Sequence, residues 1–205
     1  MSLYVAPTLR LTMSYPGGFL PRSPEMLEEV LQREHMSAAE GTPVACLHTI
    51  FEATRGAVSH DTSLDEVAPE TILLVAVDRS CLAGGWSEDH GLAMIAGLLL
   101  RMPSMTTLVA PEVQHVGGHH GHRIHAGMST GMMIVDGAAG SDGTFGRQAP
   151  VYVVAASFEQ QKQWLLACYL SGTRGEQGKM IGRMSVSFDG AEQVRLFPFL
   201  KERGE

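Results

Sequence analysis

The segment that most constrains the fold is TILLVAV at residues 71–77. It is apolar at every position after the threonine, and its isoleucine and valines favour strands. A strand that is apolar at every position, rather than at every second one, belongs in the middle of a sheet. We therefore expect a central strand over residues 71–78, with the rest of the chain arranged around it.

Six further segments have the composition of strands, and turn signals separate them. Pro16, Gly17 and Gly18 end the first one, because proline and tandem glycine interrupt strand pairing. Gly117 and Gly118 supply the positive φ angles of a tight hairpin between two of the others. The expected strands cover residues 9–15, 44–53, 106–116, 120–135, 150–156 and 180–188.

Three segments carry helix signals. The residues SPE at 23–25 combine an N-cap serine, a proline at the first helical position and an acid in the first turn. Ser157, with Gln160 three residues later, matches a capping box. The expected helices cover residues 24–36, 87–102 and 157–170.

These elements predict a single α+β domain over residues 1–205. Strands outnumber helices and several are neighbours in sequence, which favours antiparallel pairing over a parallel, doubly wound sheet. We expect a largely antiparallel sheet of about six to seven strands, flanked by about three helices.

Composition narrows the class of protein. Apolar residues make up 44% of the chain and charged residues 18%, as in an ordinary globular protein. The 15 lysines and arginines stand against 22 acidic residues, for a formal charge of −7, and no stretch gathers the basic ones into a stripe. Nucleic acid and anionic membranes are therefore not expected partners.

Several features predict a cytoplasmic location. Cys46, Cys81 and Cys168 are odd in number, far apart and in no CxxC pair, which argues against a disulfide framework and against a cysteine-based zinc site. The first 20 residues lack the pattern of a secretory signal. The apolar run at residues 92–100 is shorter than the roughly 20 residues that a membrane-spanning helix needs.

Five of the nine histidines lie within eleven residues: His115, His119, His120, His122 and His125. On a strand, His120 and His122 share a face at a spacing of about 6.5–7 Å, which two imidazoles can close around one metal ion. His115, across the hairpin, is the expected third ligand, with His119 or His125 assisting. The alternative is that these are exposed polar residues at a hairpin tip, which bind metal only adventitiously.

The residues GMSTG at 127–131 match the G-x-S-x-G pattern of a hydrolase nucleophile elbow around Ser129. In that fold the histidine follows the serine and the acid, yet no histidine follows His125 in this chain. A different fold could still use Ser129 with His125, because triads are defined by geometry and not by sequence order.

Part of the chain resembles the PsbP-like superfamily. The resemblance lies in the order of strand, hairpin, strand, capped helix and strand, within the segments HRIHAGMSTGMMIVDG, PVYVVAASFEQQKQWLLACYLSG and MIGRMSVSF, and covers residues 71–188. It implies an antiparallel sheet flanked by helices, and a non-enzymatic protein whose surfaces bind other macromolecules. It transfers no site residues, because fold alone does not fix function.

The leading hypothesis is therefore a non-enzymatic binding or scaffold protein that acts through protein–protein contacts and needs no cofactor. Its expected partner is another protein or a second copy of the chain. The alternative is a metal-binding protein that holds zinc at His115, His120 and His122. A serine hydrolase centred on Ser129 is the third hypothesis.

Overall fold

The computed structural model describes residues 1–37, 46–55, 70–78, 105–116, 122–135, 147–171, 181–198 and 200. This part of the chain forms eleven strands, one α-helix and one short 3-10 helix. Its strands build two sheets, and every pair of neighbouring strands is antiparallel. The described part of the protein is therefore predominantly β.

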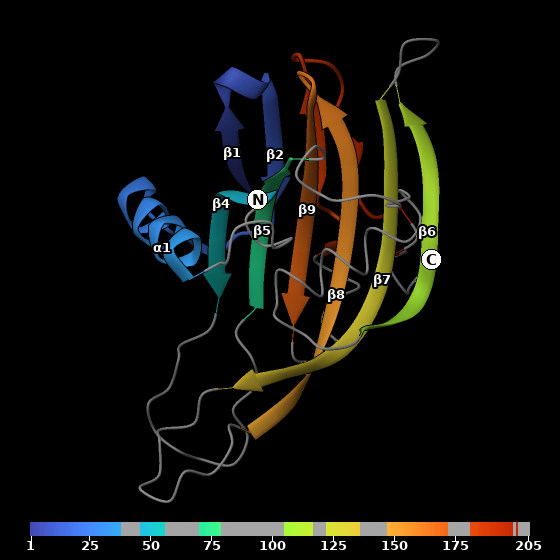
Figure 1. Ribbon diagram of the computed structural model, residues 1–205. Helices are drawn as coiled ribbons and strands as arrows, with labels where there is room; N and C mark the ends of the chain where they lie inside the picture. Colours follow the sequence, from blue (N-terminus) through green and yellow to red (C-terminus); the bar gives the residue numbers. More distant parts are fainter. Residues whose placement is uncertain are drawn as a thin grey trace, which may run out of the picture.

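The larger sheet has seven strands in the order β3-β4-β5-β9-β8-β7-β6. Figure 1 shows β4 to β6 side by side in this order. The strand with the TILLVAV run, β5, pairs with β4 and β9 and so lies inside the sheet, as its sequence predicts. The strands are β3 (Leu20–Pro21), β4 (Leu47–Arg55), β5 (Glu70–Val77), β6 (Met105–Val116), β7 (His122–Val135), β8 (Arg147–Gln160) and β9 (Gln163–Ser171).

The smaller sheet has four strands in the order β1-β2-β10-β11. They are β1 (Ser2–Ala6), β2 (Leu11–Tyr15), β10 (Ser185–Phe188) and β11 (Val194–Arg195), and the 3-10 helix η1 (Pro7–Leu9) connects the first two. The helix α1 (Pro24–Ser37) lies against β4 (Figure 1). Among the described residues, no helix has the length and apolar character to cross a membrane.

The two sheets face each other across one hydrophobic core. Phe158 of the large sheet meets Phe188 of the small one edge to face, with ring centroids 5.4 Å apart. Tyr15 of β2 also meets Phe51 of β4 across the gap, with the two rings tilted at 52° and their centroids 5.3 Å apart. Each large apolar side chain buried in such a core contributes about 1.5–3 kcal/mol, so this shared interior holds the sheets together.

The expectation of an α+β fold with about three helices is wrong. Residues 157–170 belong to the hairpin of β8 and β9 and not to a helix. Gln161 and Lys162 form its two-residue turn with φ angles of 51° and 62°, the left-handed values of a tight hairpin. Because β9 is buried on both faces, its apolar run looks the same in sequence as a buried helix.

The expected helix at residues 24–36 is confirmed as α1, where Ser23 Oγ accepts a hydrogen bond of 3.3 Å from the backbone N–H of Met26. The hairpin expected from residues 106–116 and 120–135 is also confirmed, as β6 paired with β7. The expected helix at residues 87–102 lies outside the described residues.

Candidate functional site

The histidines of the predicted metal site lie at different places. His115 is exposed on β6 and pairs in register with Arg123, whereas His122 pairs with Val116. Because adjacent strand positions belong to opposite faces, this register does not put positions 115 and 122 on one face. His125 is buried on β7. His119 and His120 lie outside the described residues.

No group of three or more histidine, cysteine, aspartate or glutamate side chains that could hold a metal ion occurs in the part of the chain that the structure describes. A closed zinc site normally takes four such ligands. The zinc hypothesis thus stays a prediction that depends on residues beyond this part.

Ser129 and His125 do not form a catalytic pair. Both are buried on β7, four positions apart, which corresponds to about 13 Å along a strand. A hydrogen bond between serine and base needs roughly 2.6–3.2 Å. Residues 127–131 continue in regular pairing with β8, so the strand-turn-helix bend of a nucleophile elbow is absent there.

The expectation that the cysteines form no disulfide is wrong for Cys46. Cys46, at the start of the β4 segment, is disulfide-bonded, and its partner lies outside the described residues. Cys168 on β9 is a free thiol. Burial raises the pKa of this thiol to about 12, so it is protonated and inert at neutral pH.

Exposed apolar side chains draw attention to the N-terminal strand. Met1, Leu3 and Val5, which we call the β1 edge, are 64%, 61% and 56% exposed. Leu3 and Val5 occupy alternate positions and so point to the same side of the sheet. Figure 1 shows β1 at the outer margin of its sheet, where β2 is its one partner among the described strands.

The opposite side of β1 is firmly anchored. Tyr4 stacks on Phe51 of β4, with ring centroids 4.4 Å apart, and its hydroxyl donates to the carbonyl oxygen of Ile50 over 3.4 Å. Burial raises the pKa of the Tyr4 phenol. The contacts of Tyr4 thus hold the strand against β4 from the inside.

The other long margin of the molecule, β6, is protected. Leu108 and Val113 are 39% and 42% exposed there. However, the pairing with β7 is irregular on both sides of Val109, and Pro111 has no backbone N–H to offer. Bulges, proline and charges such as Glu112 are the devices that keep an edge strand from pairing further. The strand β1 has none of them: its pairing with β2 is regular, and Ser2–Ala6 include no charged side chain and no proline.

Sequence reasoning missed the β1 edge, because five residues are too few to show a clear alternation. The short apolar segment SLYVA before Pro7 was the only available signal. In the part of the chain that the structure describes, two antiparallel sheets face each other, and β1 is an edge strand without the protections of β6.

Comparison with known proteins does not assign the chain to a family. No protein-family model matches the chain, and no curated protein is significantly similar to it. The PsbP-like resemblance stays a resemblance, and the capped helix that formed part of it is strand in the structure.

Proposed function

We propose that the protein is a non-enzymatic binding protein that contacts another protein chain through the β1 edge. The observation that carries this proposal is the unprotected strand itself. Its outer backbone N–H and C=O groups can pair with an added strand, and Leu3 and Val5 can bury apolar surface against it. Neither nucleic acid nor a membrane is a proposed partner, since the formal charge is −7.

A second copy of the chain is the partner that fits best. If two β1 strands pair antiparallel about Tyr4, Leu3 of each copy lies opposite Val5 of the other. Apolar side chains then meet across the pair, and no like charges are opposed, because β1 carries no charged residue. Such an interface is closed by two-fold symmetry and stops at the dimer.

The association should be weak. One five-residue strand buries far less than the about 1,200–2,000 Å² of a standard stable interface. Burying Leu3 or Val5 contributes at most about 1.5–3 kcal/mol each, and association entropy offsets much of this. We therefore expect reversible, micromolar or weaker self-association.

Sedimentation velocity over a wide concentration range tests the proposal on wild-type protein, Leu3→Lys and Leu108→Lys. Wild type should dimerise as its concentration rises, and Leu3→Lys should stay monomeric because it puts a charge in the paired surface. Leu108→Lys makes the same change at the other edge and should behave as wild type. A wild type that is monomeric throughout, or equal effects of both substitutions, would contradict the proposal.

We also propose a cytoplasmic location, which rests on the three scattered cysteines of the sequence. The disulfide at Cys46 weighs against it. Alkylation of freshly lysed native cells, followed by peptide mass spectrometry, shows whether Cys46 is reduced or oxidised in the cell. Modified Cys46 is expected in a reducing compartment, whereas Cys46 that reacts only after chemical reduction would place the protein elsewhere.

A further inference from the structure

A pocket of about 350 Å³ lies at one end of the small sheet, where η1 leads from β1 into β2. We call it the η1 pocket. Its lining comes from the end of β1, from η1 and the start of β2, and from the turn between β10 and β11, and includes Val5, Pro7, Arg10, Thr12, Asp189 and Gly190. The volume lies within the range of about 300–1,000 Å³ for sites that hold small molecules.

The two turns that form the pocket are joined through their backbones. The N–H of Asp189 donates to the carbonyl oxygen of Arg10 over 2.9 Å. The side-chain amide of Gln160, a residue only 2% exposed, donates to the same carbonyl oxygen over 3.4 Å and to Oδ2 of Asp189 over 3.5 Å. Gln160 ends β8, and Figure 1 shows η1 and the turn after β8 at the same end of the molecule. Three turns that are distant in sequence thus fix Arg10 beside Asp189.

Both residues have a backbone conformation that is unfavourable for a residue with a side chain. Arg10 has a φ of 48° and Asp189 a φ of 54°, in the left-handed region that glycine tolerates best. Such strain persists only where the surrounding structure enforces it, and it gathers at functional sites. Here it places the guanidinium of Arg10 and the carboxylate of Asp189 side by side at the pocket, with Nη1 and Oδ1 3.3 Å apart.

This ion pair has capacity left for a ligand. Its two side chains are 69% and 46% exposed. The guanidinium has five N–H donors, and among the described residues its one hydrogen bond is that to Asp189. A carboxylate oxygen can accept two hydrogen bonds, and within the same part of the chain each oxygen of Asp189 accepts one. Apolar surface adjoins the pair at Val5, which is 56% exposed, and at the exposed Pro7.

We propose that the η1 pocket binds the zwitterion of a free α-amino acid with an apolar side chain. The carboxylate of the ligand pairs with the guanidinium of Arg10, and its ammonium pairs with the carboxylate of Asp189. The two charged groups of an α-amino acid are attached to one carbon atom, which keeps them about as close together as the two charges of the ion pair. The apolar side chain of the ligand contacts Val5 and Pro7.

A zwitterion matches this pocket better than a ligand with a single charge. An anion that pairs with Arg10 meets the negative charge of Asp189, and a cation that pairs with Asp189 meets the positive charge of Arg10. An uncharged apolar ligand displaces water from both charges and replaces none of the lost hydrogen bonds. Binding here does not require the β1 edge to pair, although Val5 belongs to both surfaces.

Titrations followed by two-dimensional ¹H–¹⁵N NMR test the proposal, because the amide signals of Thr12 and Gly190 report on the pocket itself. L-Leucine is the probe, and its isomer ε-aminocaproate carries the same two charges far apart. L-Leucinamide and isocaproate each lack one of the charges. We expect saturable shifts of both amide signals with L-leucine, and binding at least about 5-fold weaker for the other three compounds. The titrations use the Leu3→Lys variant, so that the result is independent of pairing at the β1 edge.

Charge variants then identify the contacts. Asp189→Asn keeps the shape and suits a left-handed residue, and it should weaken L-leucine binding about 5- to 10-fold without weakening that of isocaproate. Arg10→Gln should weaken L-leucine binding by a similar factor without weakening that of L-leucinamide. Lys162→Gln is the matched control for Arg10→Gln, because Lys162 is also exposed, has a φ of 62° and does not line the η1 pocket.

The proposal is overturned if L-leucine causes no saturable shift at millimolar concentration, or if ε-aminocaproate binds as tightly as L-leucine. It is also overturned if Lys162→Gln weakens binding as much as Arg10→Gln. The NMR spectrum of each variant shows whether it is folded, and the comparison of the four compounds needs no substitution in the pocket.

Discussion

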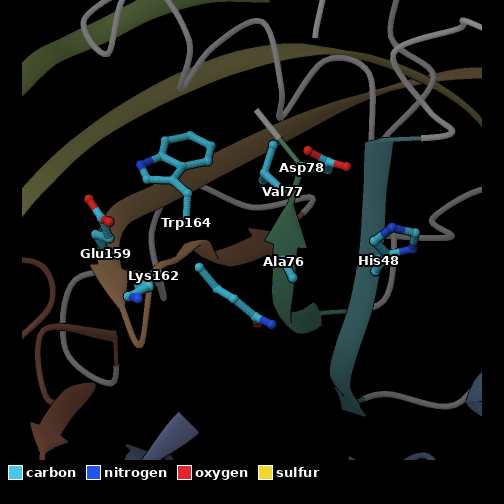
Figure 2. A pocket seen from close by; sticks show the side chains of 8 residues that line it. His48, Ala76, Val77, Asp78, Glu159, Lys162 and Trp164 are labelled. Atoms are coloured by element: carbon cyan, nitrogen blue, oxygen red, sulfur yellow. The ribbon is translucent and has the colours of Figure 1, made fainter. Parts of the chain in front are cut away.

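The two ends of the strands β4, β5 and β9 carry similar polar residues but arrange them in opposite ways. At one end, Arg55 of β4 pairs with Glu70 of β5, and the hydroxyl of Tyr169 on β9 donates to the same carboxylate. At the other end, His48, Asp78 and Trp164 of the same strands line a pocket separate from the η1 pocket (Figure 2). The first end, which we call the closed end, holds an ion pair and a hydrogen bond between strands, and the pocket of about 400 Å³ adjoins the second.

The closed end is also covered by the N-terminal segment. Gly18 has a φ of 87°, a conformation that favours glycine, and this turn places Phe19 under the Arg55 guanidinium at 5.0 Å from the ring centre. Phe19 also meets Tyr169 edge to face, at 6.4 Å. Polar residues at strand ends thus contribute to stability where neighbours complete their contacts.

Removing one carboxylate from each end should separate these roles most clearly. The side chains of Glu70 and Arg55 are only 15% and 24% exposed. Glu70→Ala leaves Arg55 and Tyr169 without their acceptor and should lower the free energy of unfolding by about 3 kcal/mol. Glu159→Ala, at the exposed end, should change it by about 0.5 kcal/mol or less. Urea unfolding followed by circular dichroism measures both.

If Glu70→Ala and Glu159→Ala lower the free energy of unfolding equally, the contrast is wrong. The pocket end would then contribute as much to stability as the closed end. An unfolding slope that changes along with the midpoint would point to altered compactness of the denatured state instead.

The residues of the closed end can be predicted from the sequence, whereas those of the pocket cannot, and the reason is physical. The strands β4 and β5 follow from their apolar, β-rich residues, and Arg55 and Glu70 flank them. The pocket could not be found in this way, because Glu159, Lys162 and Trp164 meet Val77 only through the β8–β9 hairpin. That hairpin turns at Gln161 and Lys162, which lack the asparagine or glycine that normally announces such a turn, while Ser157 and Gln160 imitate a helix cap.

The hydroxyl of Tyr169 makes the closed end sensitive to alkali. Burial, together with the hydrogen bond and the negative charge of Glu70, raises the pKa of this phenol above its ordinary value of 10.0. Nearby on β9, burial raises the pKa of Cys168 from 9.0 to about 12. Both groups keep their protons more readily when folded. Their contribution to stability is therefore complete below pH 9 and is lost as the pH rises toward the folded-state values.

Alkaline unfolding should accordingly report on the closed end and not on the pocket. Above pH 10, each of these groups can lower the free energy of unfolding by up to about 1.4 kcal/mol per pH unit. Tyr169→Phe should make this decline shallower, because the variant has no phenol to ionise, whereas Glu159→Gln should follow the wild-type curve. Urea titrations between pH 8 and pH 11 measure the slopes. If the free energy of unfolding of Tyr169→Phe falls as steeply with pH as that of wild type, the Tyr169 phenol does not titrate as its burial predicts. The two ends would then not differ in their electrostatics.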